Sequence, residues 1–254
     1  MVLRLTRIEV AGFHSLRDVV LRPRPLEVLL DPDGTATRDL IRLFTLLRAL
    51  AEGRLQEHLA LPWMADEQVT CVLGVQGDDY RVELRRFPDG RWRITREELD
   101  LAAGLGIPFV EPSDNAPQDE ARLSSFPPAL AASPPGPVAN EAEWLGQIAD
   151  GAARRMNRFL RGFRVQSAGD FTVDEESLLF LQEPGTEPGV DLPANALWDR
   201  VQAARAASAR VPVLLCTPSV ALADAFDLQD VQRVETSSDG ASFRPLGARK
   251  ERSS

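Results

Sequence analysis

Lysine is almost absent from this 254-residue sequence. The single lysine is Lys250, near the carboxyl end, so arginine carries nearly all of the positive charge. Acidic residues outnumber basic ones by 38 to 29, and the formal net charge is −9. A protein that binds nucleic acid by itself usually has a basic excess, so this balance argues against autonomous binding and leaves only a local basic face open.

Long apolar runs and paired cysteines are also missing. No apolar run approaches the roughly 20 residues that a membrane-spanning helix needs. The first residues, MVLRLTRIEVAGF, alternate apolar and polar, unlike the apolar centre of a signal peptide. Cys71 and Cys216 lie in strand-like segments and are predicted to be buried thiols, and no Cys/His cluster has zinc spacing. These features favour a cytoplasmic protein without a metal site.

The first hundred residues carry strand and helix patterns in turn. Residues 2–10, VLRLTRIEV, alternate with the period of a half-buried strand, and VVLRPRPLEVLL adds one or two more. Residues 39–51 have the spacing of a helix with one buried face, with apolar residues at Leu40, Leu43, Phe44 and Leu47. Between residues 68 and 94, three strand-like runs are separated by the turns QGDD and PDG, which predicts an antiparallel meander.

The middle of the chain is divided between a proline-rich segment and a helix. Residues 104–140 are rich in Pro, Ser and Ala, which predicts a linker or an extended wrap. Residues 141–163 are predicted to form a helix. Its end is rich in arginine, which is typical of a solvated face and alternatively of a phosphate-contacting patch; these residues are Arg154, Arg155, Arg158, Arg161 and Arg164.

The last third alternates strands and helices. SLLFLQEP and VPVLLCTP are short apolar strands, separated by the alanine-rich helix ANALWDRVQAARAASA. A short helix, SVALADAF, and a closing hairpin, VQRVET with ASFRPL, follow. Strands without polar residues that are separated by a helix indicate a covered parallel sheet.

Four segments in order resemble the ABC-type ATPase heads of the RecF and SMC-like group. The opening, with IEVAGFHSLRD, then LLDPDGTATRD and a helix, resembles the strand, phosphate loop and helix of these heads. The meander resembles their antiparallel subdomain, LLFLQEPGTEPGVDLPANAL their acidic motif, and VPVLLCTPSVALADAF their switch motif. The resemblance implies an α/β P-loop fold with a parallel core sheet flanked by helices and an antiparallel side sheet.

The loop departs from the family pattern, GPNGSGKS, at most of its positions. Asp31 stands at the first glycine, and only Pro32 and Gly34 fit. Thr37 stands in place of the phosphate-binding lysine, and Arg38 in place of the Ser/Thr that holds Mg²⁺. The positions that the resemblance implies for cofactor binding are Asp31, Asp33, Gly34, Thr35, Ala36, Thr37 and Arg38. Two carboxylates would therefore face any polyphosphate, and at about 4 Å two like charges repel by roughly 1–4 kcal/mol.

The other motifs depart in the same direction. Gln182 stands where the resemblance implies the Mg²⁺-binding Asp, and a neutral amide is a poor ligand for a hard cation. Glu183 is retained at the position of the water-activating base, and Pro218 replaces the switch histidine. The stretch between residues 165 and 178 has no Ser-Gly-rich signature turn. We therefore expect neither ATP nor Mg²⁺ as a cofactor, and no catalytic residues.

The sequence is interpreted as a degenerate, non-catalytic head that binds a protein partner. The expected parts are residues 1–103 as an N-terminal lobe, 104–140 as a linker or wrap, 141–247 as a C-terminal lobe and 248–254 as a disordered tail. The resemblance implies a DNA-repair, chromosome-maintenance or anti-phage defence assembly, with an active head or a second copy as the partner.

Two other functions stay open from sequence. One is a weak or rebuilt ATPase that uses Arg38 and Glu183, which nucleotide affinity tighter than roughly 10 μM would favour. The other is a nucleic-acid-binding module that uses the arginines between residues 154 and 164, which a steep loss of affinity with added salt would favour.

Overall fold

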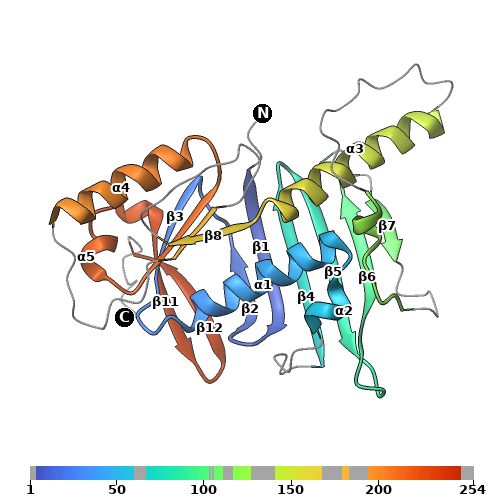
Figure 1. Cartoon of the computed structure of the whole chain (residues 1–254), viewed down its shortest axis with the longest axis horizontal. Coiled ribbons are helices and arrows are strands. Elements are labelled where there is room, and N and C mark those ends of the chain that lie inside the picture. The colour runs from blue at the N-terminus through green and yellow to red at the C-terminus, as the bar shows by residue number, and fades with distance from the viewer. Residues whose placement is uncertain are drawn as a thin grey trace, which may run out of the picture.

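Two six-stranded sheets form the frame of the molecule (Figure 1). The computed structural model describes residues 4–59, 67–102, 104, 106–110, 117–126, 141–167, 179–182 and 194–246. In spatial order, sheet A contains β2 (Leu16–Leu21), β1 (Leu5–Phe13), β4 (Gln68–Val75), β5 (Asp78–Arg86), β6 (Trp92–Asp100) and β7 (Gly106–Val110). Sheet B contains β12 (Gly240–Pro245), β11 (Val231–Ser237), β3 (Leu26–Leu30), β10 (Val213–Thr217), β9 (Leu179–Gln182) and β8 (Arg164–Ser167).

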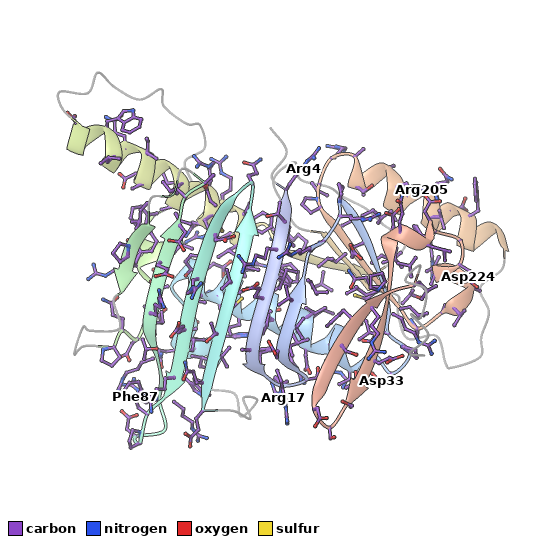
Figure 2. The ribbon with its side chains drawn as sticks, turned by 180° about the vertical axis from the view of Figure 1, so that it is seen from behind. Arg4, Arg17, Asp33, Phe87, Arg205 and Asp224 are labelled. Carbon is purple, nitrogen blue, oxygen red and sulfur yellow. The ribbon has the colours of Figure 1, made fainter. Side chains whose placement is uncertain are left out.

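Sheet A is antiparallel throughout. The predicted meander is confirmed as β4, β5 and β6. Alternation along β1 buries Ile8 and Val10 on one face, while Arg7 and Glu9 lie on the other. That second face is charged and carries ion pairs such as Arg7 Nη1 to Asp79 Oδ2 at 3.1 Å. No described helix covers it (Figure 2), as expected for an antiparallel sheet with one solvated face.

Sheet B contains the predicted parallel strands. β10 pairs in parallel with β3 and β9, β8 pairs in parallel with β9, and β11 pairs in parallel with β3. Only β12 is antiparallel, and with β11 it forms the predicted closing hairpin. All residues of β3 and β10 are buried, including Glu27 and Thr217, and their otherwise apolar sequences fit a sheet that is covered on both faces. The carboxyl ends of β3, β9 and β10 share one edge of this sheet.

Helix α1 (Thr35–Glu52) joins the two sheets into one core. Its apolar stripe is buried as predicted, and it belongs to a cluster that contains residues of both sheets, such as Leu73 of β4 and Leu214 of β10. In Figure 1, α1 runs across the same side of sheet A as α2 (Leu55–Leu59) and α3 (Glu141–Arg161). On sheet B, α4 (Ala194–Ser208) and α5 (Val220–Ala223) cover a second, smaller apolar cluster, and the short turn η2 (Leu228–Asp230) precedes β11.

The proline-rich segment contains more regular structure than the sequence predicted. Strand β7 and the 3-10 helix η1 (Arg122–Ser125) both lie within residues 104–140. Pro108 is tolerated because β7 is the edge strand of sheet A, where a missing N–H breaks no inner ladder. Residues 111–116 and 127–140 lie outside the described part, as does the predicted tail at 248–254. Within the described residues, no helix is both long and apolar enough to span a membrane.

Candidate functional site

The loop of residues 31–38 lies between β3 and the first turn of α1, at the carboxyl edge of the parallel strands. This edge is where ligands usually bind in open α/β sheets. Gly34 immediately precedes α1 with φ 67° and ψ 11°, a left-handed conformation that glycine adopts without a steric penalty. A Cβ built at Gly34 would meet no atom within 4 Å, so the backbone angle and not crowding requires the glycine.

Asp31 fills the inside of the loop with its own carboxylate. The residue is only 2% exposed, and its Oδ2 accepts a hydrogen bond from the Thr37 N–H at 2.7 Å. Its own N–H donates to the Thr217 carbonyl at 2.9 Å, which ties the loop to the end of β10. Burial raises the pKa of Asp31, hydrogen bonds from Thr37 oppose that rise, and the neighbouring Asp33 carboxylate adds to it. The loop therefore contains a buried carboxyl group whose pKa lies above its ordinary value.

Asp33 occupies the next donor of the same turn. Its Oδ1 accepts from the Thr35 N–H at 2.8 Å. The backbone N–H groups at the start of a helix are the donors that a phosphate loop presents to its ligand. Here the donors of Thr35 and Thr37 are satisfied by carboxylates of the same loop.

A nucleoside triphosphate in this loop would have to displace Asp31 and Asp33 from the N–H groups to which they are bonded, or accept the repulsion of their carboxylates. The position of the phosphate-binding lysine is Thr37, which is buried at 5% exposure. Arg38 is exposed, one residue further along the helix. The loop as folded supplies its own negative charge in place of a ligand's.

Gln182 of the acidic motif and Pro218 of the switch motif lie on the same edge of sheet B as the loop. Gln182 ends β9 and pairs in register with Cys216 of β10, and Glu183 lies outside the described residues. Pro218 follows β10 directly, next to Thr217, whose carbonyl accepts from the loop. The fold thus brings the loop and Pro218 together, as the motif order predicted.

Both cysteines are free and buried, as predicted. Burial raises the pKa of the Cys71 thiol to about 12. Burial also raises the pKa of Cys216, which a hydrogen bond from Thr37 partly opposes. Thiols that hold their protons at neutral pH are weak nucleophiles and weak metal ligands, so neither adds chemistry to the edge. No group of three or more His, Cys, Asp or Glu side chains in the described ranges could hold a metal ion.

The arginine-rich end of α3 makes contacts within the molecule. Arg161 donates through Nε and Nη2 to the Ala51 carbonyl at 3.2 and 3.0 Å, and Arg155 Nη2 contacts Asp78 Oδ2 at 3.1 Å. Arg164 donates to the carbonyls of Arg161 and Phe163. Arg154 and Arg158 also have interaction partners. These contacts favour the structural interpretation of the patch, and its role as a nucleic-acid interface stays a prediction.

A groove beside the loop was not predicted from the sequence. It is open, with a volume of about 430 Å³, and lies between the turn of β1–β2, the first turns of α1 and the turn of β11–β12. The lining residues are His14, Ser15, Arg17, Thr35, Arg38, Asp39, Arg42, Ser237, Ser238 and Gly240. Its walls come from segments more than two hundred residues apart, so no local motif could have revealed it.

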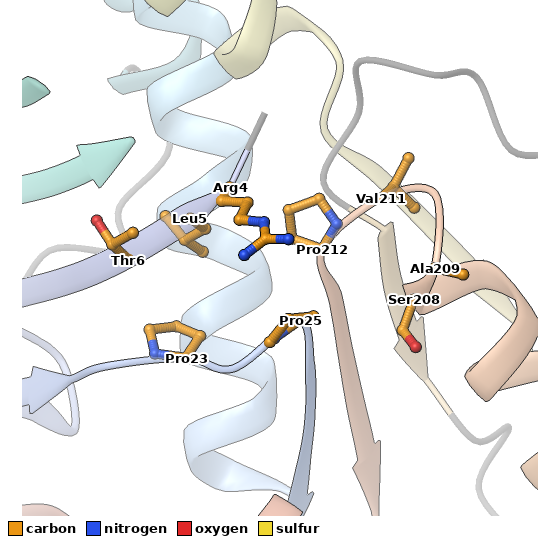
Figure 3. Close-up of a pocket in the computed structure, with 9 residues that line it drawn as sticks. All are labelled: Arg4, Leu5, Thr6, Pro23, Pro25, Ser208, Ala209, Val211 and Pro212. Atoms are coloured by element: carbon orange, nitrogen blue, oxygen red, sulfur yellow. The ribbon is translucent and has the colours of Figure 1, made fainter. Parts of the chain in front are cut away.

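A second, smaller hollow lies at the opposite edge of sheet B (Figure 3). Its volume is about 240 Å³, and three of its lining residues are the prolines Pro23, Pro25 and Pro212. Pro25 and Pro212 immediately precede β3 and β10, so the hollow lies at the amino ends of the parallel strands. It is separate from the loop and the groove.

Comparisons with known proteins return distant structural likenesses. No family model matches the sequence, and no curated protein matches it. An SMC head domain from Thermotoga maritima overlaps with a TM-score of 0.45 at 12% identity, covering 96% of this chain and 100% of that chain. An SMC head bound to the C-winged helix domain of ScpA overlaps with a TM-score of 0.44 at 8% identity, covering 94% of this chain and 97% of that one. At TM-scores below 0.5 and identities this low, these likenesses carry no further argument about the chain.

Proposed function

We propose that this chain is a catalytically inactive, ABC-ATPase-like head that acts as a protein-binding or regulatory subunit. The assembly would serve DNA repair, chromosome maintenance or anti-phage defence, with an active ATPase head or a second copy as the partner. The proposal combines the resemblance of four motifs with the geometry of the degenerate loop. No step of ATP hydrolysis is assigned to any residue.

The observation that carries the proposal is the pair of hydrogen bonds inside the loop. Asp31 Oδ2 and Asp33 Oδ1 accept from the N–H groups of Thr37 and Thr35 at 2.7 and 2.8 Å. A loop that satisfies its own donors keeps its shape without nucleotide. Its neighbouring surface is then preformed, and a preformed surface loses less conformational freedom on binding.

Exposed apolar side chains near the same edge support a protein partner. Val220 is 56% exposed and begins α5, directly after the carboxyl end of β10. Trp198 is 61% exposed near the start of α4, the helix that returns from the carboxyl end of β9 to the amino end of β10. Tryptophan is enriched among residues that dominate binding energy at protein interfaces. We expect this edge to be the partner-binding face.

Nucleotide binding tests the inactive state. Isothermal titration of the full chain with ATP, with and without Mg²⁺, is expected to show no affinity tighter than roughly 10 μM, about −7 kcal/mol. A phosphate-release assay on the same preparation is expected to stay at the level of the buffer. Tight Mg²⁺-dependent binding, or steady phosphate release that scales with protein concentration, would support the rebuilt ATPase instead.

Matched tryptophan variants test the binding face. The chain is purified from its native source with its co-purifying proteins, as the parent and as Trp198→Ser and Trp144→Ser. Trp144 is also half exposed, at 50%, but lies on α3, away from the edge. We expect Trp198→Ser to lose the partner or the dimer and Trp144→Ser to retain it. Equal retention by both variants would show that this edge does not carry the interface.

A further inference from the structure

We propose that the groove beside α1 binds a carboxylate-rich segment of a partner polypeptide, held by Arg17 and Arg38. This inference rests on the proposed function, because it names the chemistry of the partner at one part of the binding face. It adds a site with defined residues, which the degenerate motifs did not indicate.

The first observation is that two arginine side chains on the groove wall have no acidic or hydrogen-bonding partner among the described residues. Arg17 on β2 and Arg38 on α1 are both exposed, and no described residue forms a hydrogen bond or ion pair with either guanidinium. Arg42, also on the groove wall, is paired with Asp39 at 3.2 Å, so that pair is neutral. The groove therefore presents two formal positive charges on a chain whose net charge is −9. A local concentration of positive charge on an acidic protein attracts anions selectively.

The groove is held in a fixed shape, which is the second observation. Asp39 is 4% exposed, and its Oδ2 accepts from the Ser15 N–H and hydroxyl at 3.1 and 2.7 Å, which fixes α1 to the β1–β2 turn. The Ala241 N–H donates to the Ser15 carbonyl at 2.6 Å, which fixes the β11–β12 hairpin to the same turn. Three elements thus meet at Ser15, and Arg17 and Arg38 project from a rigid base.

The polar lining suits carboxylates. A guanidinium donates two parallel hydrogen bonds to one carboxylate, and the hydroxyls of Thr35 and Ser238 add neutral donors along the groove. The groove is open along its length, so an extended chain can enter from the side. Two arginines and two hydroxyls spread along the groove match a run of several acidic side chains better than a single compact anion.

A nucleotide matches the groove less well. Two N–H groups at the helix start beside it, those of Thr35 and Thr37, already donate to Asp33 and Asp31. Apart from the His14 imidazole, no described lining residue has an aromatic ring on which a base could stack. The phosphate groups of a nucleotide would therefore contact mainly Arg17 and Arg38, whereas an extended acidic polypeptide can contact residues along the whole groove.

The test uses the full chain and a fluorescently labelled polyglutamate peptide, with a polyglutamine peptide of equal length as the neutral probe. Binding is measured by fluorescence anisotropy at low and at physiological salt, and the site is mapped by NMR shifts of the arginine Nε–H groups. We expect polyglutamate but not polyglutamine to bind, with weakening at higher salt. The double variant Arg17→Ser/Arg38→Ser is expected to weaken binding at least about fivefold.

The matched control is Arg22→Ser/Arg86→Ser, which removes two exposed arginines that lie outside the groove. This control should bind polyglutamate as the parent does. Absence of binding at low salt, or equal weakening in both double variants, would overturn the groove as the site. Displacement of the peptide from the Arg17 and Arg38 signals by ATP at similar concentration would overturn the carboxylate assignment.

These outcomes are separable from a failure of the proposed function. ATP bound at the loop would shift the amide signals of Thr35 and Thr37, whereas peptide bound in the groove shifts the Arg17 and Arg38 side chains. A chain that binds ATP at the loop and polyglutamate in the groove would refute the inactive head and keep the groove. A chain that binds neither ATP nor polyglutamate would support the inactive head and refute the groove as a carboxylate site.

Discussion

Asp31 makes the loop between β3 and α1 sensitive to pH in a defined direction. Its folded-state pKa is raised, so its contribution to stability is present below the unfolded-state pKa, near 3.8, and is lost as the pH rises through the folded-state pKa. Asp31→Asn keeps an oxygen for the Thr37 N–H and cannot ionise. We expect the free energy of unfolding of the variant, relative to the parent, to increase as pH rises from about 4, by about 1.4 kcal/mol per pKa unit that separates the two states.

Denaturant unfolding of parent and variant across this pH range measures the difference. Asp239→Asn is the control, because Asp239 is an exposed carboxylate on the turn between β11 and β12. A difference between Asp31→Asn and parent that stays constant, or decreases with rising pH, would contradict the raised pKa.

Glu97 is a buried carboxylate that fixes the segment after β7 to sheet A. Its oxygens accept from the Tyr80 hydroxyl at 2.9 Å and from the N–H groups of Arg122 and Leu123 at 2.7 and 3.0 Å. Glu97→Ala leaves these three donors without an acceptor, at about 1–3 kcal/mol for each buried group. We expect urea unfolding to show a loss of at least about 3 kcal/mol, whereas the exposed Glu235→Ala changes stability by less than about 1 kcal/mol.

The side-chain positions that sequence reasoning missed have a common physical cause. Strict alternation along β6 from Ile94 would bury Arg96 and Glu98, but a register shift between β5 and β6 turns Glu97 inward instead. Bulges depend on the partner strand, so the pattern of one strand does not reveal them. The same holds for the groove, since Arg17 and Ser237 become neighbours only after the two hairpin turns pack.

The carboxyl end of α1 depends on α3 for its hydrogen bonds. Asn157 is fully buried, and its Nδ2 donates to the carbonyls of Ala51 and Leu123, both at 2.9 Å. Asn157→Asp would place carboxylate oxygens against these two carbonyls, and we expect a loss of at least about 3 kcal/mol in thermal or urea unfolding. Asp150→Asn, on the exposed part of the same helix, is the control and is expected to leave stability within about 0.5 kcal/mol of the parent. A small effect of Asn157→Asp would show that α3 is not needed to finish α1.

Regular elements with strong periodicity were predictable, and elements that depend on neighbours were not. The stripe of Leu40, Leu43, Phe44 and Leu47 predicted α1, and the apolar runs predicted β9 and β10. Strand β7 was missed because its proline and its short length oppose a strand, while the edge of sheet A supplies the pairing. Of the candidate site, the sequence indicated where the loop departs from the family pattern, but not that Asp31 and Asp33 accept hydrogen bonds from the N–H groups of Thr37 and Thr35.

The larger of the two apolar clusters contains residues of both sheets, so we expect the molecule to unfold as a single unit. Helix α1 packs between them, and one buried cluster contains Leu73 and Trp92 of sheet A together with Leu214 of sheet B. Leu214→Ala deletes core volume in sheet B and is expected to cost about 2–5 kcal/mol. Because this cluster contains residues of both sheets, we expect sheet A to unfold in the same transition.

A chain with Trp63, Trp144 and Trp198 replaced by Phe isolates the fluorescence of Trp92, which is 6% exposed in sheet A. Urea unfolding of this chain, with and without Leu214→Ala, is followed by Trp92 fluorescence and by circular dichroism. If the sheets unfold together, the Leu214→Ala midpoint falls equally in both signals, although the substitution lies in the other sheet. A Trp92 midpoint that stays in place while the circular dichroism curve divides into two steps would show instead that the sheets unfold independently. The loop and the groove would then be held by sheet B and the β1–β2 turn without the rest of sheet A.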